Sequence, residues 1–174
     1  MTAFLLALCL AAAEVPQAEV RPRAVRDDPR SQRGWVISGE AGWNSLTGLG
    51  AVVARHLDPH LTVEAGVGLS AEGPKFGARV RYNFLVGEWT PFFGAGFLYG
   101  TGVRQSTYTV GPSPFMQLVG GIEYQSRTGF TWLGALGYAW LLRENLTTFR
   151  GAPSGVGLLT GGGPVFSTSF GYAF

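Results

Sequence analysis

The chain alternates between apolar and small or polar residues with a period of two, and this alternation limits its fold more than any other feature. It starts at Gly34, reaches Phe174 and breaks at turn-like residues roughly every 10 to 20 positions. Such a pattern is typical of strands rather than helices. Each predicted strand has about the 9 to 11 residues that a tilted strand needs to cross a bilayer. The eight predicted strands lie near residues 35–43, 47–56, 61–70, 75–85, 90–101, 115–125, 130–141 and 164–174.

The two faces of these strands carry different side chains. Most aromatic residues fall on one face, whereas the other is rich in glycine and serine, with Phe92 as its only predicted aromatic residue. Because an eight-stranded barrel is only just wide enough inside for side chains, the rings must point outward. An outward apolar face is favourable against lipid and prone to aggregation in water. This parity, the alternation of side chains between the two faces of each strand, therefore predicts an all-β fold, an eight-stranded antiparallel up-and-down transmembrane β-barrel. A soluble lipocalin-like barrel would have the reverse arrangement.

Composition agrees with a membrane barrel. All 27 glycines follow residue 33, and only 14% of the residues are charged. The glycines have no Gly-X-Y period, and the strands are rich in aromatic residues, so the chain is neither collagen-like nor disordered. Clustered basic residues occur only in residues 19–33, and nucleic-acid binding is therefore not predicted.

The first 33 residues are predicted to lie outside the barrel. Residues 3–13 form an apolar run that is long enough for a signal peptide and too short for a membrane-spanning helix. A signal peptide is predicted at residues 1–13, with cleavage after residue 13 or as late as residue 18. It contains Cys9, the only cysteine, so no disulfide is expected in the mature chain. Residues 14–33 are predicted to form a flexible basic linker, and residues 34–174 the barrel.

The connections predict that both chain ends face the periplasm. At one end of the strands the connections are short turns, at residues 58–60, 87–88 and 127–129. The connections at the other end include two long polar loops, at residues 102–114 and 142–163. Outer-membrane barrels have short periplasmic turns and longer outer loops. Aromatic girdles are predicted near both membrane interfaces. They include Trp35, Trp89 and Trp132 at the periplasmic rim and Trp43, Phe115 and Trp140 at the outer rim.

Charged side chains on the inward face are predicted to pair, because charges in a narrow interior need partners. If Ser70 faces Lys75 across a regular hairpin, Glu64 lies directly opposite Arg81, with Arg79 on the diagonal. The ion pairs are predicted to plug the lumen, and a gate that exchanges partners to open a pore is the alternative. The predicted lumenal ion network consists of Glu40, Glu64, Arg79, Arg81 and Glu123.

The sequence offers little for catalysis or metal binding. Its histidines, His56 and His60, flank the Asp58–Pro59 turn on the predicted inner side. These side chains could hold a metal weakly, but a polar turn is the preferred interpretation. No catalytic residue, cofactor site or metal site is predicted, and the protein is expected not to be an enzyme.

The last strand is the most specific element of the sequence. Residues 166–174 alternate aromatic with small side chains and end on Phe174. Over residues 34–174 the chain resembles the small eight-stranded outer-membrane barrels of the OmpA and OmpX type in Gram-negative bacteria. The resemblance implies a place in the bacterial outer membrane, among its lipid and lipopolysaccharide. It also implies that the outer-membrane assembly machinery reads the end of the last strand, namely Phe170, Tyr172 and Phe174.

The expected role is that of an integral outer-membrane barrel with a plugged lumen and a structural or surface-interaction function. Its exposed elements would be the loops at residues 102–114 and 142–163, and a monomer is expected. A small-solute channel or binding barrel is the alternative. A lipid-modifying enzyme is less favoured, because such members of the resembled family place a histidine at the outer rim, whereas His56 and His60 fall on the inner side.

Overall fold

The computed structural model describes residues 27–104, 108–143, 146–148 and 162–174. The predicted signal peptide and the first part of the predicted linker lie outside these residues. Among the described residues, no helix has the length and apolar character needed to cross a membrane.

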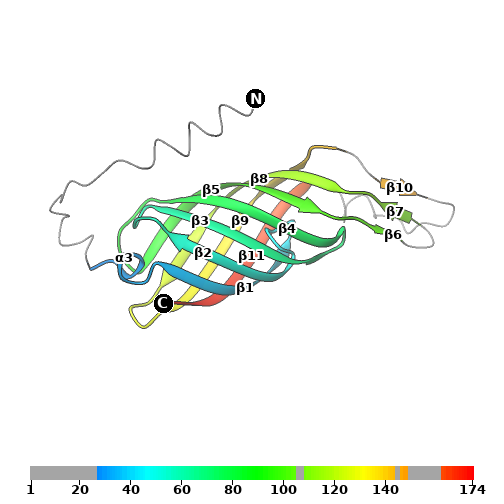
Figure 1. Cartoon of the computed structure of the whole chain (residues 1–174). Coiled ribbons are helices and arrows are strands. Elements are labelled where there is room, and N and C mark those ends of the chain that lie inside the picture. The colour runs from blue at the N-terminus through cyan, green and yellow to red at the C-terminus, as the bar shows by residue number, and fades with distance from the viewer. Residues whose placement is uncertain (1–26, 105–107, 144–145, 149–161) are drawn as a thin grey trace, which may run out of the picture.

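Eight strands form a closed antiparallel barrel in which every strand pairs with its neighbours along the chain, and the first pairs with the last (Figure 1). The predicted up-and-down β-barrel is therefore confirmed, with strand ends within about two residues of their predicted places. The barrel strands are β1 (Trp35–Trp43), β2 (Leu49–His56), β3 (Leu61–Ser70), β4 (Gly73–Asn83), β5 (Trp89–Gly100), β8 (Ser113–Gln125), β9 (Phe130–Leu141) and β11 (Gly163–Ala173).

A second, small sheet lies beyond one end of the barrel, away from the carboxyl terminus (Figure 1). It pairs β10 (Leu146–Thr148) with β7 (Tyr108–Val110), and β7 with β6 (Val103–Arg104). These segments were predicted only as parts of the two long loops, at residues 102–114 and 142–163. Runs of two or three residues are too short to show a period of two, so the alternation could not reveal them.

The aromatic face of the barrel points outward, as the parity predicts. Phe93, Phe97 and Phe170 are each about half exposed, and so are the rings of Trp35 and Trp89. Phe92 points inward as predicted, but Phe115 was wrongly placed in the outer girdle. Strand β8 begins before Phe115, which therefore shares the inward parity of Gln117 and lies fully buried.

The segment before β1 forms a short helical turn, α3 (Pro29–Gln32), at the end of the barrel where the chain terminates (Figure 1). The Asp28 side chain caps this turn by accepting a hydrogen bond from the backbone N–H of Arg30, and Pro29 occupies the first helical position. Both Asp28 and Arg30 are buried. The prediction of a flexible linker up to residue 33 is thus wrong for its last residues.

Candidate functional site

The lumen is lined by charged side chains that nearly balance one another, and it is the candidate functional site. The barrel strands supply most of these groups from their inward positions, the turn between β3 and β4 supplies Glu72, and α3 and the residue before it add one pair. All of them are almost fully buried, including every residue of the predicted ion network. This lumenal network consists of Asp28, Arg30, Glu40, Glu64, Glu72, Lys75, Arg79, Arg81 and Glu123.

Glu64 on β3 lies at the centre of the lumenal network and meets two arginines from β4. Arg79 lies directly opposite Glu64, and its Nε donates to Glu64 Oε2 over 2.6 Å. Arg81 lies on the diagonal, with its Nε 2.8 Å from Glu64 Oε1 but without the alignment of a hydrogen bond. The predicted pairing had these two arginines the other way round.

The register difference comes from the hairpin between β3 and β4. Ser70 pairs with Gly73 rather than Lys75, which shortens the connection to two residues. Gly73 adopts a φ of 91°, a backbone conformation that glycine accepts without strain. Because the shift is by two residues, Arg79 and Arg81 keep their inward orientation and only the partners change.

Arg81 connects strands of the barrel that are not direct neighbours, because β5 lies between β4 and β8. Its Nη1 and Nη2 donate to the two carboxylate oxygens of Glu123 on β8, over 3.0 and 3.3 Å. Its guanidinium group also lies 4.8 Å from the centre of the Phe92 ring. A forked arginine–carboxylate pair of this kind fixes both direction and distance, so Arg81 ties β3, β4 and β8 together through the interior.

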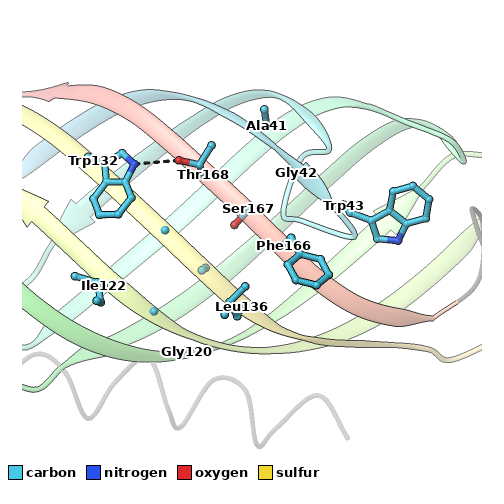
Figure 2. Close-up of a pocket in the computed structure, with 13 residues that line it drawn as sticks. Ala41, Gly42, Trp43, Gly120, Ile122, Trp132, Leu136, Phe166, Ser167 and Thr168 are labelled. Carbon is cyan, nitrogen blue, oxygen red and sulfur yellow. Dashed lines mark hydrogen bonds between the residues drawn. The ribbon is translucent and has the colours of Figure 1, made fainter.

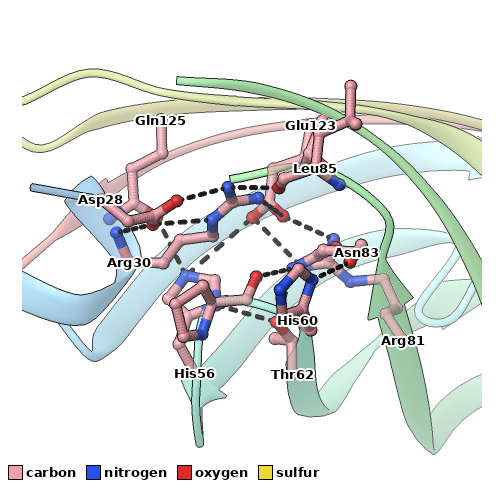
Figure 3. Close-up of polar contacts among 12 residues, drawn as sticks. Asp28, Arg30, His56, His60, Thr62, Arg81, Asn83, Leu85, Glu123 and Gln125 are labelled. Atoms are coloured by element: carbon pink, nitrogen blue, oxygen red, sulfur yellow. Dashed lines mark hydrogen bonds and ion pairs between the residues drawn. The ribbon is translucent and has the colours of Figure 1, made fainter. Parts of the chain in front are cut away.

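Arg30 lies at the end of the barrel where α3 is found, which we call the inner mouth after its predicted orientation (Figure 3). Its Nε and Nη2 donate to Asp28, and Nη2 also donates to the carbonyl oxygens of Leu85 and Gly87, over 3.0 and 2.8 Å. Its Nη1 lies 3.9 Å from Glu123 Oε2. Arg30 is not part of the predicted ion network, because it lies in a charged segment without hydrophobic periodicity. The Asp28–Pro29 pair, a typical helix start, was the available signal.

The two histidines lie near the inner mouth and do not converge. His56 bonds through Nδ1 with the Thr62 hydroxyl and through Nε2 with Gln125 Oε1, over 2.8 and 2.9 Å (Figure 3). His60 Nδ1 donates to the carbonyl oxygen of Asn83. Among the residues that the structure describes, no group of three or more His, Cys, Asp or Glu side chains is placed to hold a metal ion.

The outer mouth is closed by the connection between β1 and β2, residues 44–48, which folds into the lumen. Glu40 Oε2 accepts hydrogen bonds from the backbone N–H and the hydroxyl of Thr47, over 2.9 and 2.8 Å. Gln117 on the far side donates to the carbonyl oxygen of Asn44 over 2.9 Å. Leu46 at the tip is fully buried in an apolar cluster with Leu98 and other inward residues. A short connection had been predicted here, but not its inward course.

Two hollows adjoin the lumenal network. The cavity beside Glu64, Arg81 and Glu123 has a volume of about 20 Å³, which is enough for about one water molecule. A hollow of about 250 Å³ lies between the connection at residues 44–48 and the pair Glu72 and Lys75. The described side chains of the network are held by ion pairs and hydrogen bonds.

Asp28 is the titratable group that holds α3 against the barrel. Its burial raises the pKa, but hydrogen bonds from the Arg30 side chain and the Gly87 backbone N–H, together with the positive charge of Arg30, lower the pKa below its ordinary value of 3.8. Gly87 donates to Asp28 Oδ2 over 2.7 Å. The docked position of α3 therefore favours the ionised carboxylate.

Comparisons with known proteins agree with this architecture. The sequence matches no protein-family model and no curated protein. The N-terminal β-barrel domain of OprF from Pseudomonas aeruginosa is 12% identical, with a TM-score of 0.51, and the match covers 80% of this chain and 98% of that domain.

Two further solved structures are similar at lower TM-scores. Neisserial surface protein A is 12% identical, with a TM-score of 0.46, and covers 80% of this chain and 94% of its own. Outer Membrane Protein W from E. coli is 14% identical, with a TM-score of 0.47, and the match covers 82% of this chain and 98% of that chain. Identities this low concern the fold alone. In its fold, this chain is similar to the small eight-stranded barrels of the outer membrane.

Proposed function

We propose that this protein is an integral outer-membrane barrel with a plugged lumen, whose role is structural or based on surface interactions. The observation that supports this proposal is a series of buried polar contacts along the lumen. Arg30 closes the inner mouth, Arg81 bridges the middle, and Glu40 holds the connection that closes the outer mouth. The loops at residues 102–114 and 142–163 would then provide the surface available to partners.

The outer surface supports a membrane location. Large apolar side chains are exposed on all eight strands of the barrel, which would be an aggregation hazard in water and is favourable in hydrocarbon. The exposed indoles of Trp35 and Trp89 at one end and of Trp43 and Trp140 toward the other fit the interfacial preference of tryptophan. Outer-membrane lipid and lipopolysaccharide are accordingly its proposed surroundings.

A gated conduit for small solutes is the second candidate. It is favoured by the way in which the inner mouth is closed, since α3 is a single short turn outside the barrel wall and is held largely by Asp28 and Arg30. Opening would also require the Arg81 bridge to break in a buried site, where unpaired charges are costly. The placement of His56 and His60 near the inner mouth supports a non-enzymatic role.

Conductance separates these two candidates. Purified protein that migrates differently on gels with and without heating should show no steady single-channel current in planar bilayers. The heat-dependent shift shows that the sample is folded, so the absence of current is interpreted only for protein that shows this shift. Steady currents from folded wild-type protein would contradict the plugged lumen and favour the conduit.

The end of β11 is proposed as the assembly signal. The rings of Phe170, Tyr172 and Phe174 all lie exposed on the outward face, while the backbone of Phe174 exchanges hydrogen bonds with Trp35. A side-chain change at Phe174 therefore leaves this closure of the barrel intact.

Phe174→Ala should lower the fraction of protein recovered in the outer membrane several-fold, as measured by fractionation and heat-dependent gel mobility. Phe166→Ala is the matched control, because Phe166 is an equally exposed ring on the same face of β11. Equal losses for the two variants would show that β11 needs apolar area and that its end carries no specific signal.

A further inference from the structure

An apolar groove crosses the lipid-facing surface of the barrel over β8, β9, β11 and β1. Its volume is about 580 Å³, within the roughly 300 to 1,000 Å³ of ordinary ligand pockets. Trp132 and Ile122 stand toward the inner end and Phe166 and Trp43 toward the outer end (Figure 2). Between them the wall is reduced to small residues, including Gly120.

The fold does not require glycine at the bottom of this groove. A Cβ atom at Gly120 would come no closer than 3.6 Å to another atom, which is ordinary contact, and at Gly134 it would meet the edge of the Trp132 ring at 3.2 Å. By contrast, a Cβ at the neighbouring inward Gly121 would lie 2.0 Å from a backbone oxygen. Crowding thus explains Gly121, whereas side chains would fit at Gly120. The hollow is therefore a feature of the sequence that barrel closure does not demand.

The lining of the groove is mostly apolar, which favours an apolar occupant. The polar side chains of Trp132 and Thr168 satisfy each other, since the indole Nε1 donates to the Thr168 hydroxyl over 3.0 Å (Figure 2). Ser167 also lines the groove, with a buried Oγ that has no hydrogen-bond partner among the described residues. The remaining lining side chains are aromatic, aliphatic or glycine, so a hydrocarbon chain fits most of this space.

The groove continues to the rim that lies opposite the chain ends. A second hollow of about 320 Å³ shares Trp43 and Phe166 with the first and extends to residues 162–164, where β11 begins. Together the two hollows extend from Trp132 and Ile122, toward the inner end of the barrel, to the outer rim.

We propose that this groove binds one acyl chain of lipopolysaccharide, with the headgroup beyond the outer rim. The proposal rests on the outer-membrane location and orientation proposed above. The groove is continuous with the exposed apolar belt that contacts lipid, so acyl chains are what surrounds it. Its open end lies at the outer rim, on the leaflet that lipopolysaccharide occupies. A groove lined by rings immobilises one chain more strongly than the convex remainder of the belt does.

Native mass spectrometry of detergent-folded protein, titrated with Kdo2-lipid A, tests this site. Gly120→Leu and Gly134→Leu fill the groove, and each should weaken binding at least about tenfold, which is the cost of losing about two buried methylene groups. Gly39→Leu is the matched control, because a Cβ at Gly39 would come no closer than 4.0 Å to another atom, and Gly39 lies on β1 and does not line the groove. It should bind like wild type.

The outcomes separate this inference from the proposed function. Equal binding by all four proteins overturns the groove site while leaving the membrane barrel intact, provided that all show the heat-dependent gel shift. Phosphatidylethanolamine binding as tightly as Kdo2-lipid A overturns the assignment to lipopolysaccharide. Dimers that disappear in Gly120→Leu show that a second copy is the occupant. Wild-type protein that is absent from the outer-membrane fraction contradicts the proposed function itself.

Discussion

Arg81→Glu should destabilise the barrel more than any other single change in the lumen, with a loss of at least about 3 to 5 kcal/mol in the free energy of unfolding. Arg81 is buried and contacts Glu64 at 2.8 Å and Glu123 at 3.0 Å. Removing it alone would leave Glu123 with two more distant contacts, Arg30 Nη1 at 3.9 Å and His56 Nε2 at 4.0 Å. Reversing its charge places a third carboxylate between the two, beside a cavity that has room for only about one water molecule.

Urea unfolding of detergent-folded protein, followed by tryptophan fluorescence and by gel mobility without heating, measures this loss. Arg127→Glu is the control, because Arg127 forms an ion pair with Glu88 over 3.8 Å in which both side chains are exposed to solvent. An exposed pair of this kind contributes about 0 to 1 kcal/mol. Losses of similar size for the two reversals would show that the lumen is hydrated and that its ion pairs do not hold the barrel.

Exchanging Glu64 and Arg81 in one double variant should not restore stability. For an isolated pair, such an exchange keeps the attraction and rescues the single reversals. Here each residue has a second partner, since Glu64 also meets Arg79 and Arg81 also meets Glu123. The exchange therefore places two arginines together on one side and two carboxylates on the other. Rescue to wild-type stability would mean that these second contacts contribute little.

The barrel could be predicted from the sequence, because the alternation of side chains between the two faces of a strand does not depend on which strand is its neighbour. Every residue of the predicted ion network is buried in the lumen, although the β3–β4 register was predicted wrongly by two residues. A shift of two preserves the face on which each side chain lies. Exact partners, such as Arg79 opposite Glu64, depend on turn geometry at Gly73, and an Ala-Glu-Gly-Pro sequence permits more than one turn.

The inward course of residues 44–48 and the position of Arg30 were not predicted from the sequence, because both depend on contacts with distant residues. Leu46 lies in a short polar connection, and only the closed barrel offers the apolar cluster that buries it. Arg30 lies 55 and 57 residues away from the carbonyl groups that it bonds. Alternation and composition describe each segment by itself, and neither shows that a segment folds back into a mouth that other strands create.

Arg30→Ala should release α3 from the inner mouth and expose the backbone amide of Gly87 to exchange. In the docked state this amide donates to Asp28 Oδ2 over 2.7 Å, and Arg30 holds Asp28 in place through two side-chain hydrogen bonds. Hydrogen bonds to charged groups are worth about 1.5 to 3 kcal/mol each. Loss of one such bond corresponds to a roughly 10- to 100-fold lower protection factor for Gly87 in hydrogen exchange.

Acid should have the same effect on the wild type. Because docking lowers the pKa of Asp28 below 3.8, protons bind more tightly to the free segment than to the docked one. The contribution of this carboxylate to docking is therefore complete above pH 3.8 and is lost as the pH falls through the lower pKa of the docked state. Asp28→Asn should show the reduced protection at every pH, with no further loss on acidification.

The Leu57 amide serves as the reference in both experiments. It donates to the Leu61 carbonyl oxygen in a neighbouring inner turn and does not bond to α3, so its protection, corrected for intrinsic exchange, should stay unchanged. If Gly87 and Leu57 lost protection together in Arg30→Ala, the change would report opening of the whole barrel end. If Gly87 kept its protection in Arg30→Ala and at low pH, Asp28 and Arg30 would not be what holds the inner mouth closed.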